Sequence, residues 1–243
     1  MKVLNIYTTY SCPYKCKFCF NLNKCNDTTQ IDLDYVDDFL KKHAKLFDKI
    51  VITGGEPSFL VKSYINELIE IIKKYHENIE FSTYNTNDII YDNVSYNISY
   101  DFVIRPKADV MWKKLLDFNR PFTLTTTLSP LIFRIPPNKI IMTLNLLKYL
   151  RKFVIIPFYQ SESIRYNILN NDYKRFLSYI ELFKKDAKYQ IEYNPMPDEY
   201  NLTPYNKLTI TQFDNNGIRF EKEIKPTEIK KETTNYPKNI IIW

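Results

Sequence analysis

The stretch that decides the fold is YSCPYKCKFCFN, residues 10–21. It holds Cys12, Cys16 and Cys19, and the chain's fourth cysteine, Cys25, follows shortly after. Disulfides are typical of secreted chains whose cysteines are spread along the sequence, whereas thiols clustered in one loop are typical of a metal site. The spacing therefore predicts that this loop binds metal.

Zinc and an iron–sulfur cluster are the two alternatives for that metal. Zinc sites usually take four nitrogen or sulfur ligands, often as two separated pairs. Cys25 is a candidate fourth ligand, but there is no second Cys-x2-Cys pair, and His43 and His76 fall on expected helices. Three thiolates within eight residues suit a cubane cluster that leaves one iron open to another ligand.

A second motif, KIVITGGEPSF, spans residues 49–59. The chain has only three glycines, and two of them, Gly54 and Gly55, directly follow an apolar run here. Glycine is used where φ is positive or where a ligand approaches the backbone, and an ordinary turn is the alternative. Since Asn and Asp serve most other turns of this chain, we interpret the pair with Glu56-Pro57 as a functional motif.

In this order and spacing, the CxxxCxxC loop, with Phe18 before its last cysteine, and the strand-borne GGEP resemble the radical S-adenosylmethionine (SAM) enzymes. The resemblance is firm over residues 1–60 and looser to residue 160. It implies that the three cysteines of the CxxxCxxC motif hold a [4Fe–4S] cluster whose open iron is chelated by SAM. It also implies that the glycine pair and Glu56 receive the methionine ammonium, for which carbonyl and carboxylate oxygens are suitable acceptors.

The resemblance implies a reaction as well. The reduced cluster passes an electron to the sulfonium of SAM, and a 5′-deoxyadenosyl radical forms and abstracts hydrogen from the substrate. An electron donor such as flavodoxin or ferredoxin is expected as a partner. The residues that act on the substrate stay unknown.

The rest of the chain predicts an α/β fold, a partial (β/α)6 TIM-like barrel open on one side, because expected strands alternate with expected helices. Strands are expected at residues 3–9, 49–53, 79–83, 102–105, 123–127 and 153–158. Helices are expected at residues 32–47, with Asp32 as N-cap, and at 60–75, 108–118, 138–152 and 171–185. Residues 88–99 do not have a helical pattern, which leaves the third crossover open.

Sites in such barrels lie at the carboxyl ends of the strands. That rule nominates polar and other residues that follow the expected strands, namely Asn85, Arg105, Lys107, Thr125, Thr127, Pro157 and Tyr159, with a structural role as the alternative for each. Asn85 and Arg105 are preferred, Arg105 and Lys107 being expected near the ribose or carboxylate of SAM. Asn87-Asp88 stands where the family often has Asn-Gly.

Two residues of the cysteine loop have open roles. Asn21 resembles the asparagine of the Cys-x-Asn segment in glycyl-radical activases, where it lies beside SAM, and it is also a candidate loop cap. Cys25 is a spare thiol, a redox residue or a fourth cluster ligand. We favour the spare thiol, since a fourth ligand would exclude SAM from the cluster.

The C-terminal part differs in character from the barrel core expected at residues 1–185. Residues 186–243 predict a strand, a loop, a β-hairpin with Asn-Asn-Gly at 215–217, and a closing apolar strand, NIIIW. This extension is expected to cover the open side of the barrel, and its lack of cysteine excludes an auxiliary cluster there.

The substrate is left open between three classes. The chain length and the Cys-x-Asn segment resemble glycyl-radical activases, which act on a protein. The segment DFVIRPK at 101–107 faintly resembles 7-carboxy-7-deazaguanine synthases. A peptide-modifying enzyme is the third alternative. We favour a peptide or protein over a small molecule, and the non-enzymatic alternative is a metal-stabilised binding module.

The composition bounds the location and partners of the protein. A cytoplasmic protein without membrane spans is expected, because no apolar run approaches ~20 residues and the N-terminus lacks a signal-peptide pattern. The net charge of +6 suits an anionic partner. However, codon bias explains the abundance of Lys, Asn, Ile and Tyr equally well, so nucleic-acid binding is not expected.

Overall fold

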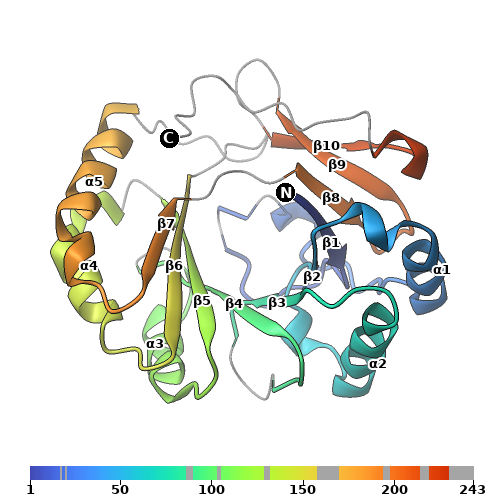
Figure 1. The fold of residues 1–243 in the computed structure, drawn as a ribbon, viewed down its shortest axis with the longest axis horizontal. Coiled ribbons are helices and arrows are strands. Elements are labelled where there is room, and N and C mark those ends of the chain that lie inside the picture. Colours follow the sequence, from blue (N-terminus) through green and yellow to red (C-terminus); the bar gives the residue numbers. More distant parts are fainter. Residues whose placement is uncertain are drawn as a thin grey trace.

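The protein is a curved sheet with helices along its outer side, as the computed structural model in Figure 1 shows. The structure describes residues 1–16, 18–19, 21–85, 90–102, 105–128, 132–157, 170–193, 198–213 and 219–229. The strands are β1 (Lys2–Tyr7), β2 (Lys49–Thr53), β3 (Ile79–Thr83), β4 (Ser95–Ser99), β5 (Phe122–Leu128), β6 (Leu150–Pro157), β7 (Gln190–Tyr193), β8 (Asp198–Leu202), β9 (Leu208–Phe213) and β10 (Arg219–Glu223). The helices are α1 (Leu33–His43), α2 (Lys62–Lys73), α3 (Ala108–Asp117), α4 (Pro137–Leu144) and α5 (Asn170–Phe183).

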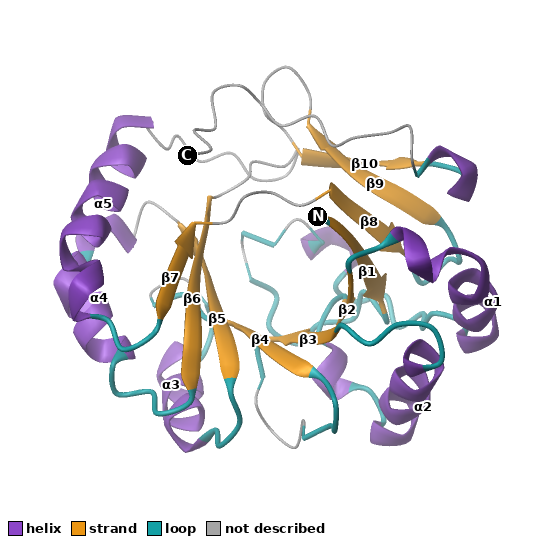
Figure 2. Cartoon of the chain, in the orientation of Figure 1, coloured by secondary structure: helices purple, strands orange, loops and turns teal. Residues whose placement is uncertain are grey.

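The strands form one open sheet in the order β10-β9-β8-β1-β2-β3-β4-β5-β6-β7. Every neighbouring pair from β8 to β7 is parallel, and β9 and β10 continue the sheet antiparallel beyond β8. The arc of strands in Figure 2 does not close into a barrel, since β10 and β7 are its two edges. The expected α/β partial barrel, open on one side, is therefore confirmed.

The hydrophobic core lies between the sheet and the helices. Leu4, Ile6, Ile50 and Ile52 point to this side and are fully buried together with apolar residues of α1 and α2. The start of α1 is where the sequence indicates. Asp32 caps α1 by accepting a hydrogen bond from the backbone N–H of Asp34 at 2.9 Å, as expected.

The opposite, concave face of the sheet carries a row of polar side chains across β2, β3, β4 and β5. Lys49 donates to Glu80 at 3.0 Å, Asn97 Nδ2 donates to the same carboxylate at 3.2 Å, and Thr125 Oγ1 donates to Asn97 Oδ1 at 2.6 Å. The chain of contacts crosses β2, β3, β4 and β5. Since side chains alternate between the two faces of a strand, these strands bury most of their apolar residues on the helix side and present these polar residues, together with Val51 of β2, to the inside.

Three expectations about the elements are wrong. The fourth strand is β4 at Ser95–Ser99 rather than residues 102–105. Its Tyr96 and Ile98 are buried, but its inward-facing residues are serines and an asparagine, so its sequence does not have the apolar character expected of a strand. The helix expected at 138–152 ends at Leu144, and β6 begins within the same apolar run. Residues 198–202, expected as a loop, pair with β1 as β8.

The remaining expectations have different outcomes. The expected hairpin exists as β9 and β10, while its Asn-Asn-Gly turn and the NIIIW segment lie outside the described residues. The third crossover has no helix in its described part, residues 84–85 and 90–94. Within the described ranges, no helix combines the length and apolar character that crossing a membrane requires. The division at residue 185 stays a prediction.

Candidate functional site

The cysteine loop runs from the end of β1 to the start of α1. Its base is closed by a bridge between Thr9 and Gln30 and by a hydrogen bond from Ile31 N to Thr8 O at 3.0 Å. Within the loop, Cys12 N donates to Cys25 O at 3.0 Å and Cys19 N donates to Cys16 O at 2.9 Å. The loop is therefore folded back on itself by its own backbone, which brings Cys25 against Cys12.

The three motif thiols act on one another electrostatically. Burial raises the pKa of Cys16 to about 11; Arg105 opposes this rise, while negative charge on Cys12 and Cys19 adds to it. Burial also raises the pKa of Cys12, and charge on Glu56 and Cys19 adds to that rise. Cys25 is not among the main charges that shift either pKa. The three cysteines that the CxxxCxxC motif nominated therefore lie within electrostatic reach of one another, and their role as cluster ligands stays a prediction.

The glycine pair lies against the root of this loop. A Cβ atom on Gly54, whose φ is +134°, would be 2.4 Å from Thr9 O, and one on Gly55 would be 2.1 Å from Ser11 O. Gly55 N donates to Thr9 O at 2.7 Å, and Glu56 N donates to Ser11 O at 3.0 Å. Any side chain at either position would separate the end of β2 from the loop. Backbone packing is one reason for the glycines; approach of a cofactor stays a prediction.

Glu56 is a buried carboxylate, 2% exposed, that joins the ends of β2 and β3. It accepts hydrogen bonds from Ser58 Oγ at 2.8 Å, Ser58 N at 3.3 Å, Tyr84 N at 2.8 Å and Thr83 Oγ1. Burial raises its pKa, and these neutral donors oppose the rise. Pro57 follows it, buried, at the start of the 3-10 turn Pro57–Phe59.

Tyr84 connects this region to the cysteine loop, and sequence reasoning missed it. Its ring meets the ring of Tyr14, which lies between the first two cysteines, edge to face at 4.6 Å. Its hydroxyl donates to Pro106 O at 2.7 Å. The residue after it, Asn85, is buried as expected for a strand end, and its Oδ1 accepts from Lys114 Nζ at 3.3 Å.

Arg105 and Asp101 form a buried ion pair beyond the end of β4. Arg105 Nε donates to Asp101 Oδ2, and Asp101 Oδ1 accepts from Thr127 N at 2.6 Å and from Thr126 Oγ1 at 3.2 Å. Asp101 was not nominated because the fourth strand was placed after it. With β4 at Ser95–Ser99, Asp101 stands at the carboxyl end of a strand, where polar residues were sought.

The other nominated residues are spread along the same edge of the sheet. Thr127 is near the end of β5 and contributes its backbone N–H to Asp101. Thr125 lies deeper, within the chain of contacts on the concave face. Pro157 is the last residue of β6. Lys107 adopts a left-handed conformation, φ 59°, just before α3.

Asn21 is buried, 7% exposed, at the start of the 3-10 turn Leu22–Lys24. Its side chain makes no capping hydrogen bond, so the capping alternative finds no support. Tyr159 and Asn87-Asp88 lie outside the described residues.

The residues present fit a thiolate-bound iron–sulfur cluster and its SAM ligand. All four cysteines are reduced thiols, and the three of the motif are close enough to shift one another's pKa. No three His, Cys, Asp or Glu side chains in the described ranges are arranged to hold a single metal ion. Glu56, which accepts hydrogen bonds from the neutral groups of Ser58, Thr83 and Tyr84, is next to these thiols and is an acceptor that suits an ammonium.

Comparisons with known proteins agree with this reading. The family model described as "Radical SAM superfamily" matches residues 6–115. SuiB of Streptococcus suis, solved bound to S-adenosylmethionine, has 12% identity, a TM-score of 0.67, and a match that covers 85% of this chain and 59% of SuiB. SuiB bound to the precursor peptide SuiA gives 13% identity, a TM-score of 0.65, and 85% and 58% coverage.

A third solved structure, anSMEcpe with bound AdoMet and the Cp18Cys peptide, has 17% identity and a TM-score of 0.54, and its match covers 78% of this chain and 62% of that one. These likenesses concern the fold, and this chain spans about three fifths of the length of each of these proteins. No curated protein matches the sequence. The family-model match, which covers just under half of the chain, and a partial barrel that carries its cysteines on the loop after β1 together support a place for this chain in the radical SAM superfamily.

Proposed function

We propose that this protein is an enzyme that binds a [4Fe–4S] cluster through Cys12, Cys16 and Cys19 and uses it to cleave SAM. The observation that carries the proposal is the grouping of these three thiols on one loop, packed against the Gly-Gly-Glu segment after β2. When bound, the reduced cluster supplies the electron for the cleavage of SAM, which yields a radical able to take hydrogen from a substrate.

The chain's own residues have separate tasks in this proposal. The cysteine loop holds the thiols in place through its backbone hydrogen bonds. Glu56 and the carbonyl groups of Gly54 and Gly55 accept the methionine ammonium, because they offer acceptors and the ammonium offers only donors. Glu56 is fixed for this purpose by Ser58 and Tyr84, which prevent its rotation. A flavodoxin or ferredoxin is the proposed electron donor.

The proposed substrate is a peptide or protein. SuiB and anSMEcpe, which share the fold, were solved with a bound precursor peptide and a bound peptide respectively. The concave face offers a support of its own. Its donors and acceptors, which include Glu80, Asn97 and Thr125, line the inside of the sheet and suit a ligand rich in amide groups.

The test uses protein reconstituted anaerobically with iron and sulfide and then reduced with dithionite. Formation of 5′-deoxyadenosine from SAM is expected, and its absence from protein with a complete cluster would refute the proposed activity. The substrate class is then tested with two probes, a uniformly deuterated peptide library and deuterated nucleosides. Deuterium in 5′-deoxyadenosine should come from the peptides; transfer from nucleosides alone would replace the peptide proposal with a nucleobase-modifying one.

A further inference from the structure

The guanidinium group of Arg105 lies between two aromatic rings. Its Cζ atom is 5.1 Å from the ring centroid of Phe18 and 5.0 Å from that of Tyr84. Phe18 belongs to the cysteine loop, between Cys16 and Cys19, whereas Tyr84 follows β3. Arginine stacks on aromatic faces through its planar, delocalised charge, so this one side chain joins the loop to the sheet.

Arg105 is itself fixed by Asp101. The side chain of Asp101 is 2% exposed and that of Arg105 is 16% exposed, so the pair is largely removed from water. The second oxygen of Asp101 is bound to Thr127 N and Thr126 Oγ1, which anchors the carboxylate to β5. A buried pair with its remaining acceptor satisfied has a defined geometry, unlike an exposed pair.

The two ends of the cysteine loop are held in different ways. Backbone hydrogen bonds hold the base, where Thr8 and Thr9 meet Ile31 and Gly55. At the tip, aromatic side chains of the described residues make contacts beyond the strand ends: Tyr14 meets Tyr84, and Phe18 meets Arg105. The positions of Cys16 and Cys19 therefore depend on side chains that the CxxxCxxC motif does not specify.

We propose that Arg105 is a positioning residue that fixes the tip of the cysteine loop against the barrel and keeps one positive charge over Phe18, between Cys16 and Cys19. This inference rests on the proposed function, because it concerns the thiols that would hold the cluster. It assigns Arg105 to the loop rather than to the ribose or carboxylate of SAM.

The charge has a consequence of its own. The guanidinium of Arg105 lies over the ring of Phe18, between Cys16 and Cys19. A fixed positive charge there would stabilise the state of a bound cluster that carries one more electron, because net charge nearby is one of the factors that set iron–sulfur potentials. The proposal therefore makes two separate predictions, one for the order of the loop and one for the reduction potential.

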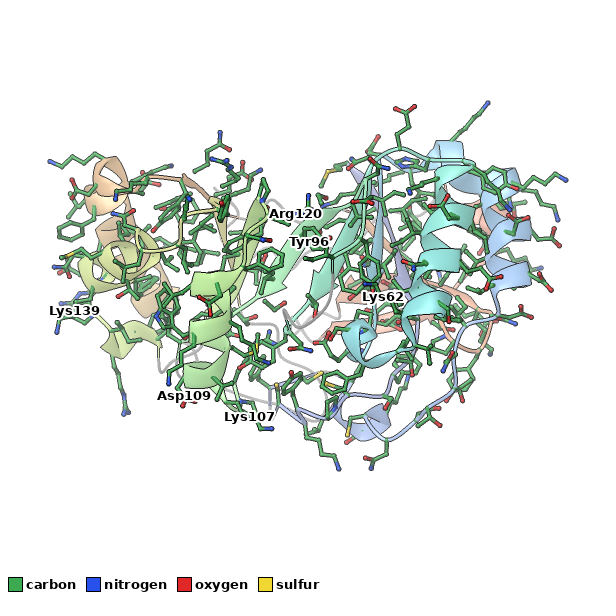
Figure 3. All side chains as sticks on the ribbon, turned by 90° about the horizontal axis from the view of Figure 1, so that it is seen from below. Lys62, Tyr96, Lys107, Asp109, Arg120 and Lys139 are labelled. Atoms are coloured by element: carbon green, nitrogen blue, oxygen red, sulfur yellow. The ribbon has the colours of Figure 1, made fainter. Side chains whose placement is uncertain are left out.

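The first test is hydrogen exchange in the metal-free protein. Arg105→Gln should accelerate exchange of the backbone N–H groups of Cys19 and Leu22, which are bonded within the loop. The matched control is Arg120→Gln, since Arg120 is exposed and precedes β5, at the opposite end of the sheet from Lys107 in Figure 3. Equal exchange in the two variants would overturn the positioning role.

The second test is a redox titration of the reconstituted protein followed by EPR. Arg105→Gln should lower the midpoint potential. Arg105→Lys keeps the charge without the planar group, so its midpoint potential should stay near that of the wild type, while the backbone N–H groups of its cysteine loop should exchange faster. Unchanged potential and exchange with weaker SAM binding would instead return Arg105 to the role of a SAM ligand. If wild-type protein forms no cluster, the proposed function fails, whereas the exchange test still decides the loop contact.

A second variant covers failure of Arg105→Gln to fold. Phe18→Leu removes the ring from the loop side and leaves the Asp101 ion pair intact. It should accelerate exchange at Cys19 more than Phe59→Leu does, since Phe59 is 58% exposed and its ring meets that of Tyr14, on the other side of Cys16 from Phe18. If both variants have the same effect, the Arg105–Phe18 contact does not hold the loop.

Discussion

Glu56 and Asp101 are both buried carboxylates beyond the carboxyl ends of parallel strands, yet their surroundings differ. Glu56 accepts from hydroxyl and backbone groups of Ser58, Thr83 and Tyr84, all neutral donors. Asp101 accepts from the charged guanidinium of Arg105 as well as from Thr127 N. The negative charge of Asp101 is thus compensated by the chain itself. That of Glu56 is stabilised by dipoles alone.

This difference indicates where a cationic ligand belongs. An ammonium group gains most from a carboxylate whose charge the protein has not already neutralised, and it gains little beside an existing ion pair. We therefore expect the methionine ammonium beside Glu56, after β2, and not beside Asp101, after β4. The two regions also hold the cysteine loop differently. Near Glu56, the glycine pair contacts it through the backbone, whereas near Asp101, Arg105 contacts it through side chains.

Removal of the charge of Asp101 should have the largest effect on stability. Asp101→Asn leaves Arg105 buried without its counter-ion, which typically costs about 3–5 kcal/mol of the free energy of unfolding. Urea denaturation of the metal-free protein measures it, with Asp117→Asn on the exposed end of α3 as the control. If the free energy of unfolding falls no more than it does in the control, the Asp101–Arg105 ion pair does not contribute to stability.

A methyl group at Gly55 should have the next largest effect. The new Cβ in Gly55→Ala would lie 2.1 Å from Ser11 O and 2.4 Å from Tyr10 O, both backbone atoms that cannot rotate away. Overpacking of this kind costs about 1–3 kcal/mol, and here it also displaces the residues just before Cys12. Iron content after reconstitution should fall along with stability. Full iron content would argue against the packing of the glycine pair as the support of the loop.

Neutralisation of Glu56 should have a smaller effect on folding and a clear effect on SAM. A charge-assisted hydrogen bond contributes about 1.5–3 kcal/mol, so Glu56→Gln should weaken SAM binding by about one to two orders of magnitude while the cluster still assembles. Calorimetry on the reconstituted variant measures it, with the exposed Glu77→Gln as control. Unchanged affinity would leave Glu56 as a brace between β2 and β3.

The pH dependence of stability offers a ligand-free check on the same residue. Burial raises the pKa of Glu56 above its ordinary value of 4.5, so the folded protein binds this proton more tightly than the unfolded chain does. Its contribution is fully present below pH 4.5 and is lost as the pH rises through the raised pKa. Relative to Glu56→Gln, the wild type should therefore lose stability over that range; parallel pH profiles would contradict the assignment.

The motifs of the candidate site could be identified in the sequence, whereas the fourth strand near them could not. The three cysteines and the Gly-Gly-Glu motif are local patterns, and the structure brings them together. The strand at Ser95–Ser99 was not predicted because its inward-facing residues are polar, and the apolar residues near 102–105 resemble a strand more closely. Without that strand, Asp101 could not be recognised as a residue at a strand end.

Contacts between side chains distant in sequence could not be predicted at all. The contact of Arg105 with Phe18 joins residues 87 positions apart, and that of Tyr14 with Tyr84 joins residues 70 apart. No periodicity or motif records which of the many aromatic residues of this chain will meet. Arg105 was nominated for its place near the end of a strand, and only the structure indicates its role toward the loop.

The central claim is that three of the four cysteines hold the cluster, and the direct measurement is iron and sulfide per chain after anaerobic reconstitution. Wild type and Cys25→Ala should each contain about four of both, and Cys16→Ala should contain almost none. Loss of the cluster in Cys25→Ala would contradict the assignment of the ligands. Stoichiometric zinc without sulfide in the wild type would contradict the account as a whole.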